Sequence, residues 1–465
     1  MKELNFEGNI TAKEMLSMVI RLSIPAFFAS MTTVMMEYID AGMVGSLGAN
    51  ATAAIGLVSS STLLIGGLAI AASTGFSVQV AQLIGAKCEG AARNVVRQGM
   101  MTVLIFGFIL MAVTASISGA LPRWLGGGED ICGDASAYFL IYGLFLPVMQ
   151  LRFLSGAMLQ CSGDMKTPSI LNIILCILDI IFNFILIFPS GTINIAGFSI
   201  PVPGAGLGVA GAALGTAFAE VVVTALMLFA LCVKSEKLAL RLGGEWRFNK
   251  NTMKTAARIA IPSAFEHTIM CGSYIVDTII IAPLGTVAIA ANSLAITAES
   301  LCYMPGYGIA SAATTLVGQS IGAGRKDLSM RLAKLSTALG MGVMAVMAAV
   351  MFITAPYMLS LLTPSEEVRQ LGSAVLRMAA FAEPLCAAAI VCAGALRGAG
   401  DTLVPGIMNL LCMWGIRITA ALILVGPFGL YGFWAAMCGE NCIRGTLFII
   451  RMLRGKWLER DVIKV

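Results

Sequence analysis

The chain has 465 residues, of which 58% are hydrophobic and only 12% are charged. A soluble domain carries roughly 25% charged residues, so this chain lacks the polar side chains to cover itself. Its formal net charge of +5 reflects basic residues in alternate connections, which indicates membrane topology and not nucleic-acid binding. Composition therefore excludes an ordinary soluble enzyme and predicts an all-α, polytopic membrane protein.

Apolar stretches recur along the whole chain and predict twelve transmembrane helices. Each stretch is long enough to cross a hydrocarbon core of about 30 Å at 1.5 Å per residue. In chain order they lie at about residues 20–37, 51–72, 100–118, 138–160, 168–190, 206–233, 255–282, 286–317, 335–360, 371–396, 403–426 and 429–450.

The connections between these stretches predict the orientation of the chain. Residues 1–14 are polar, so we expect no removable signal peptide and a cytoplasmic start. Lys and Arg gather in this segment and in every second connection, whereas the opposite loops carry only Arg123 and Arg369. By the positive-inside rule, both termini are predicted to face the cytoplasm across the plasma membrane.

The motifs of nucleotide-driven and metal-dependent proteins are missing from the sequence. It contains no GxxxxGK[ST] and no HExxH motif, and its single histidine, His267, cannot form a multi-histidine metal site. We therefore expect no enzyme, no organic cofactor, and neither nucleotide nor nucleic acid as a partner.

The sequence repeats itself at an offset of 237 residues. Six matching positions illustrate the register, namely Asp40 with Asp277, Gln82 with Gln319, Gly85 with Gly322, Pro147 with Pro384, Asp164 with Asp401 and Asn172 with Asn409. A repeat this long indicates a duplicated helical bundle.

The repeat predicts two six-helix lobes, at residues 1–235 and 236–465, joined by the charged linker 234–254. Six spans per lobe is an even number, so the lobes run parallel and are related by a pseudo-twofold axis along the membrane normal. In transporters of this design the substrate site lies between the repeats.

Ionisable residues inside the predicted spans are the main functional candidates, because burying charge in a bilayer is costly. The acids are Glu37, Asp40, Asp179, Glu220, Glu266, Asp277, Glu299, Glu383 and Glu440, and the bases are Arg21, Arg152, Arg258, Arg377, Arg417 and Arg444. Acids outnumber bases, so some of them must be protonated, solvated or bound to a cation.

Asp179 and Asn183 lie four residues apart, which places both on one face of the fifth predicted span. Asp40, in the first span, has no basic neighbour one helical turn away. Carboxylate and amide oxygens suit a hard ion such as Na⁺, or a held proton. The alternative is a buried, hydrogen-bonded polar patch.

Three other positions, Glu266, Arg417 and Pro25, have defined expectations. Glu266 is predicted either to contact substrate or ion, or to pair with an arginine, and Arg417 to form a structural ion pair with Glu383 or Glu440. Pro25 is predicted to kink the helix that carries Asp40.

Several motifs resemble the multidrug and toxic compound extrusion (MATE) family. They are Asp40-Ala41-Gly42-Met43-Val44-Gly45, Gln82-Leu83-Ile84-Gly85-Ala86, Tyr303-Met304-Pro305-Gly306, Leu396-Arg397-Gly398-Ala399-Gly400-Asp401-Thr402, and Trp414 with Arg417. The resemblance covers nearly the whole chain. It implies a V-shaped arrangement of twelve helices and Na⁺- or H⁺-coupled export of amphipathic, often cationic, small organic molecules.

The resemblance also implies a cation site in the first half, which falls on Asp40, Asp179, Asn183 and Thr216. The helix-five pair reads Asp then Asn here, whereas the family commonly has Asn then Asp or Asn, and Glu220 stands where glutamine is frequent. The helix-seven glutamate of some branches would fall near Met270, one turn from Glu266.

Glu266, Glu220, Glu37, Asp277 and Glu299 remain candidates for contacting substrate or coupling ion. We expect a monomer in contact with membrane lipid. Two alternative functions stay open at this point: flipping of a lipid-linked oligosaccharide, which predicts a passage rich in Arg and Lys, and export of an endogenous metabolite.

Overall fold

The computed structural model describes Phe6, Gly8 and residues 10–195, 198–240, 244 and 246–459, so part of the predicted linker lies outside the described residues. These residues are mostly helical, which confirms the predicted all-α membrane fold. The first half contains α1 (Ala12–Gly45), α2 (Ala49–Gly85), α3 (Glu89–Ile117), α4 (Leu121–Trp124), α5 (Glu129–Leu144), α6 (Leu146–Cys161), α7 (Lys166–Ile187), β1 (Pro189–Ile195), β2 (Phe198–Ala205), α8 (Gly208–Phe229) and the π-helical turn η1 (Ala230–Lys234).

The second half repeats this helical plan. It contains α9 (Lys250–Ile281), η2 (Ala282–Leu284), α10 (Thr286–Gly322), α11 (Lys326–Leu362), α12 (Glu366–Ala380), α13 (Glu383–Gly398), α14 (Leu403–Leu410), the π-helical segment η3 (Leu411–Ile418), α15 (Thr419–Leu453) and η4 (Lys456–Glu459).

Nine helices in the described residues are long and apolar enough to cross a membrane. Two further spans are bent pairs, α5 with α6 at 51° and α12 with α13 at 59°. Pro147 and Pro384 stand at the start of α6 and α13, directly after each bend. Proline cannot donate the backbone hydrogen bond that would continue the preceding helix, so the repeated proline explains why both halves bend at the same place.

The helical stretch Leu403–Leu453 has 51 residues. At 1.5 Å per residue this stretch is far longer than a core of about 30 Å requires. Its backbone leaves the helical region at Gly429, with φ 56° and ψ −135°, two residues after Pro427. The stretch therefore forms two spans, and the described residues fit the twelve predicted spans.

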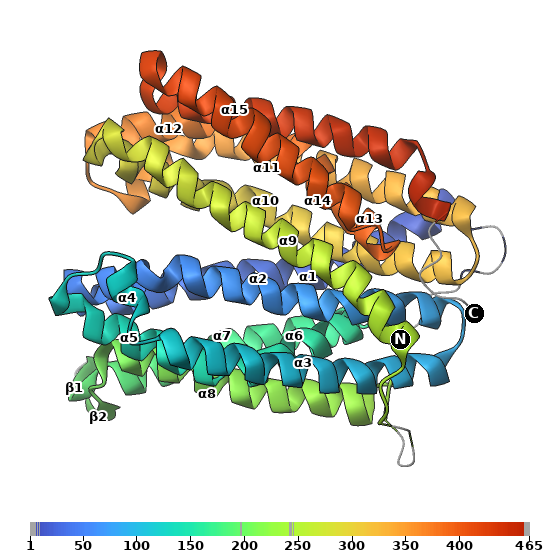
Figure 1. Cartoon of the computed structure of the whole chain (residues 1–465). Helices are drawn as coiled ribbons and strands as arrows, with labels where there is room; N and C mark the ends of the chain where they lie inside the picture. Colours follow the sequence, from blue (N-terminus) through green and yellow to red (C-terminus); the bar gives the residue numbers. More distant parts are fainter. Residues whose placement is uncertain are drawn as a thin grey trace.

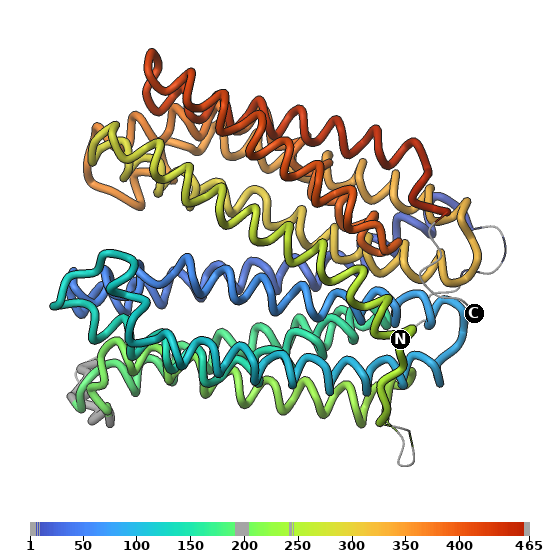
Figure 2. Tube along the Cα trace, viewed as in Figure 1, coloured from blue at the N-terminus to red at the C-terminus, as the bar shows by residue number. Residues whose placement is uncertain are grey.

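The helices form two groups that converge toward one end of the molecule, where the α2–α3 and α10–α11 connections lie, as Figures 1 and 2 show. The helices α1–α8 make up one group and α9–α15 the other. In between, α1 contacts α10, and α2 contacts both α9 and α10.

The first turns of α1 and α9 pack against the opposite half. Met15, Val19 and Leu22 of α1, together with Phe6, belong to a buried cluster built from the second half, including Leu316, Leu332, Phe448 and Trp457. Ala256 of α9 belongs to a first-half cluster that includes Val80 and Val96. Each leading helix therefore connects the two halves.

A feature that the sequence analysis did not predict is the hairpin after α7. β1 and β2 pair antiparallel, with Thr192 opposite Pro201 and Asn194 opposite Ser199. This hairpin occupies the connection between α7 and α8 and lies at the end of the molecule that also holds α4 (Figure 1). It lies outside the helical bundle.

Candidate functional site

A cluster of polar side chains joins α1, α7 and α8 in the first half. The Asn183 Nδ2 group on α7 donates hydrogen bonds to Asp40 Oδ1 at 2.9 Å and to Asp179 Oδ2 at 3.0 Å. The carboxyl groups of Asp40 and Asp179 lie side by side, and Thr216 lies within reach of Asp179. The structure therefore brings together the four residues of the predicted cation site, which we call the first-half acid cluster.

Two oxygens in this cluster have no donor. Asp179 and Asn183 are at most 1% exposed, and Asp179 Oδ1 and Asn183 Oδ1 are buried without a hydrogen-bond partner. No ion pair to Asp40 or Asp179 is found in the described part of the chain. Buried acceptors are normally satisfied, and adjacent carboxylates repel each other, so this arrangement suits a proton or a small cation.

Close approach of α7 and α8 positions Asn183. A Cβ atom at Gly215 would overlap Asn183 Oδ1 and lie 2.8 Å from its backbone nitrogen, and one at Gly211 would overlap the Leu186 carbonyl oxygen. Small residues four apart let two membrane helices approach backbone to backbone. The Gly211/Gly215 spacing is a signal for this contact that the sequence analysis did not use.

Replacing Gly215 by Ala is expected to lower both stability and transport. The added methyl group must push α8 away or rotate Asn183, which breaks its hydrogen bond to Asp40, and overpacking of this kind costs about 1–3 kcal/mol. Thermal unfolding of the purified protein and transport by proteoliposomes would measure the two effects. Gly56→Ala is the matched control, because nothing lies within 4 Å of a Cβ at Gly56; a parental phenotype for Gly215→Ala would contradict the packing argument.

The other first-half acids have separate environments. Glu220, 4% exposed, pairs with Arg152 Nε, and Arg152 Nη1 also contacts Asn172 Oδ1 at 3.5 Å. Glu37 is exposed on α1, one turn before Asp40. The Arg152–Glu220 pair was not predicted, because the sequence does not show how α6 and α8 are rotated toward each other.

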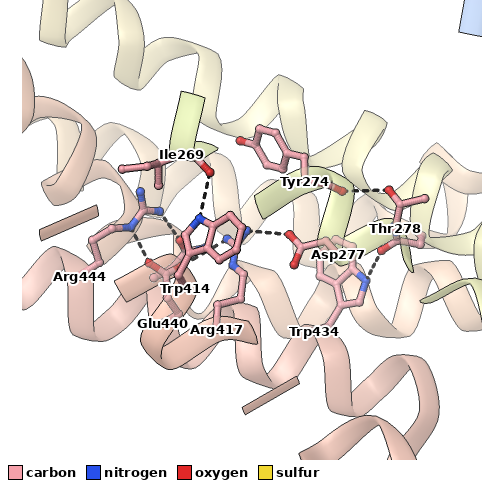
Figure 3. Close-up of polar contacts among 11 residues, drawn as sticks. Ile269, Tyr274, Asp277, Thr278, Trp414, Arg417, Trp434, Glu440 and Arg444 are labelled. Carbon is pink, nitrogen blue, oxygen red and sulfur yellow. Dashed lines mark hydrogen bonds and ion pairs between the residues drawn. The ribbon is translucent and has the colours of Figure 1, made fainter. Parts of the chain in front are cut away.

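Charged side chains in the second half form a chain of ion pairs (Figure 3). Arg417 Nη1 donates to Asp277 Oδ2 at 3.2 Å, and Arg417 Nη2 lies 3.2 Å from Glu440 Oε2. Arg444 Nε lies 2.8 Å from Glu440 Oε1. Two acids and two bases balance here, and we call them the second-half charge chain.

The repeat gives the same position opposite environments in the two halves. Asp40 meets Asn183 and a second acid, whereas its counterpart Asp277 meets the cation of Arg417. Arg417 lies on η3, where a wider π-helical turn changes the direction in which its residues point. The first half therefore keeps an acid cluster without a paired base, and the second half neutralises the corresponding acid.

Two further acids are buried in the second half. One of the two predicted pairings joined Glu383 to Arg417, and the structure does not show this contact. The carboxyl group of Glu383 lies beside Glu299 and Cys302 instead, and its Oε2 atom has no hydrogen-bond partner among the described residues. Glu266 accepts a hydrogen bond of 2.6 Å from Asn409 Nδ2. Glu440, the other predicted partner, does pair with Arg417. Whether Glu383 or Glu440 meets Arg417 depends on how the helices are rotated about their axes.

These features define a class of protein, a polytopic membrane transporter with duplicated helical halves and an acid cluster in one of them. The MatE family model matches residues 25–185 and 262–423, which lie in the two halves. The chain therefore belongs to the MatE family and is an efflux transporter.

Relatives and solved structures agree with this assignment. A "Probable multidrug resistance protein NorM" from Thermotoga maritima is 26% identical, over 96% of this chain and 94% of its own. An "Uncharacterized transporter YisQ" from Bacillus subtilis is 24% identical, with 95% of each chain covered.

Two solved structures share the fold at low sequence identity. The MATE transporter VcmN of Vibrio cholerae has a TM-score of 0.88 at 17% identity, covering 96% of this chain and 99% of its own. A MOP superfamily transporter from Pyrococcus furiosus has a TM-score of 0.87 at 20% identity, covering 98% and 100%.

Proposed function

We propose that the chain is an antiporter that exports amphipathic, cationic small organic molecules in exchange for Na⁺ or H⁺. The observation that carries the proposal is the first-half acid cluster, where two buried oxygens, Asp179 Oδ1 and Asn183 Oδ1, lack donors beside two adjacent carboxyl groups. An incoming cation or proton would satisfy these oxygens. The T. maritima relative bears the name of a multidrug resistance protein, which supports the substrate class.

Coupling between cation and substrate requires differential affinity, and the ion gradient supplies the energy. A ligand shifts a two-state transporter only as far as its affinities for the two states differ. The cluster therefore drives export if cation binding and substrate binding favour different states or exclude each other. Lys and Arg gather at the convergent end of the helix groups, which supports a cytoplasmic location for that end.

Oligosaccharide flipping receives no support from the buried bases. Arg152, Arg417 and Arg444 each pair with a buried acid, so their charge is already balanced. An anionic lipid-linked substrate would need unpaired bases along its route. We therefore propose a cationic substrate and not an anionic one.

Reconstitution tests the proposal with ethidium as the probe. Purified protein in proteoliposomes is expected to move ethidium against its gradient when an opposing Na⁺ or pH gradient is imposed. An ionophore that dissipates the gradient should stop the movement. Absence of gradient-driven movement under both conditions, together with transport of a lipid-linked sugar, would overturn the proposal in favour of the flippase alternative.

A further inference from the structure

The helices α2 and α10 cross at the convergent end of the molecule, and their crossing is reciprocal. A Cβ atom at Gly85 would overlap the Gln319 carbonyl oxygen, and one at Gly322 would overlap the Gln82 carbonyl oxygen. The offset of 237 relates the two glycines and the two glutamines to each other. Only glycine permits so close a backbone approach, so each half meets the other through the same pair of residues.

The two glutamine side chains reach across this crossing. Gln82 Nε2 donates to the Gly398 carbonyl oxygen at 3.2 Å, and Gln319 Nε2 donates to the Cys161 carbonyl oxygen at 2.7 Å. Cys161 ends α6 and Gly398 ends α13. Carbonyl groups at a helix C-terminus lack a donor within their own helix, so each half supplies the donor that the other half needs.

Burial and neighbouring contacts reinforce this arrangement. Gln82 and Gln319 are at most 1% exposed, so water does not compete for their hydrogen bonds. On the α10 side, Ser311 Oγ donates to Gln160 Oε1 at 3.0 Å and Thr315 Oγ1 donates to the Gln160 carbonyl oxygen at 3.1 Å. These four hydrogen bonds help to join the halves at the convergent end of the molecule.

We propose that Gln82 and Gln319 form a reversible clasp that closes the cytoplasmic end of the passage and opens once in each transport cycle. This inference rests on the proposed function, because alternating access requires the halves to separate where they now meet. Hydrogen bonds suit such a contact, because bonds to water replace them when the halves separate, and the net free-energy cost of opening is therefore small.

A native thiol reports directly on the clasp. The Cys161 side chain is 5% exposed and lies beside Ser77 of α2 and Thr315 of α10, so separation of the halves exposes it. Cys392, 0% exposed, contacts Thr337 of its own half and serves as the internal reference. Mass spectrometry after N-ethylmaleimide treatment of the full-length protein gives the modification rate of each cysteine.

Gln82→Leu and Gln319→Leu are each expected to raise the Cys161 rate about fivefold, and the double variant about 25-fold, with Cys392 unchanged. Gln150→Leu is the matched control: Gln150 is a fully buried glutamine on α6 whose amide atoms have no hydrogen-bond partner in the described part of the chain. An unchanged Cys161 rate in the double variant would overturn the proposal. An equal rise at Cys392 would overturn it too, because that result means general loosening.

Transport kinetics distinguish the clasp from a purely structural role of the two glutamines. A variant that favours the cytoplasm-open state has a larger fraction of its molecules ready to bind internal substrate, so KM for ethidium should fall. The maximal rate should fall as well, because return to the closed state becomes less favourable. A raised or unchanged KM in both single variants would contradict the clasp. The thiol measurement needs no transport, so failure of the proposed function and failure of the clasp remain distinguishable.

A second pair of variants covers the case in which leucine prevents folding. Gln82→Glu and Gln319→Glu keep the side-chain shape but replace the amide donor with a carboxylate that repels the carbonyl oxygen. Lowering the pH protonates the carboxylate and restores a donor. Burial disfavours the carboxylate, so these variants lose their donor only at alkaline pH. The Cys161 rate, normalised to the parent protein at the same pH, should be raised at alkaline pH and return toward the parent as the pH falls; a ratio independent of pH would overturn the proposal.

Discussion

Asp179→Asn and Asp40→Asn are each expected to abolish ion-driven efflux and to weaken cation binding by about 100-fold or more. Each change removes one of the two adjacent carboxyl groups, and an amide can neither carry the charge that attracts a cation nor release a proton. The loss should appear in ethidium transport by proteoliposomes and in the stabilisation that Na⁺ or pH gives to thermal unfolding.

Asp134→Asn is the matched control for these variants, because Asp134 is exposed at the start of α5 and lies outside the cluster. Its transport and ion response should equal those of the parent. Coupled transport at the parental rate in Asp40→Asn would remove that carboxyl group from the mechanism. The same result in both variants would leave the acid cluster as a hydrogen-bonded polar patch, the alternative that the sequence left open.

Arg417→Leu is expected to destabilise the protein by about 3–5 kcal/mol, because removing one partner of a buried ion pair leaves its acids uncompensated. Asp277 and Glu440 are 7% and 0% exposed, so water reaches neither acid freely. The thermal unfolding midpoint of the purified protein should fall by several degrees.

The double variant Asp277→Asn with Arg417→Leu tests whether uncompensated buried acids cause this loss of stability. Removing both partners costs much less than removing one, and Glu440 keeps its contact with Arg444. The double variant should therefore regain most of the stability lost by Arg417→Leu alone. If Arg417→Leu unfolds at the parental temperature, the charge chain does not hold the second half together, and Arg417 becomes a candidate for a role in transport.

The sequence predicted the elements of the fold because hydropathy and the 237-residue repeat report directly on span length and order. It predicted the convergence of Asp179 and Asn183 because residues four apart share a helix face. The bends before Pro147 and Pro384 were detectable in principle, since both prolines occupy one repeat position.

Contacts between helices were not predictable in the same way. The sequence does not show how two helices are rotated about their axes, and this rotation decides that Arg417 meets Asp277 and Glu440 while Glu383 meets Glu299. The π-helical segment η3 shifts the direction of Arg417 without a sequence signal. The hairpin of β1 and β2 was missed because hydropathy windows suited to long spans do not resolve short strands.

The packing of α1 has a consequence for biosynthesis. Met15, Val19 and Leu22 leave the ribosome long before their buried neighbours, such as Leu316 and Phe448, which lie far later in the chain. At roughly 5–20 residues per second, translation of the intervening chain takes tens of seconds. Throughout that interval lipid or an insertion factor must shield the leading helix, so a truncated nascent chain ending before α10 should leave α1 accessible to cross-linking by its surroundings.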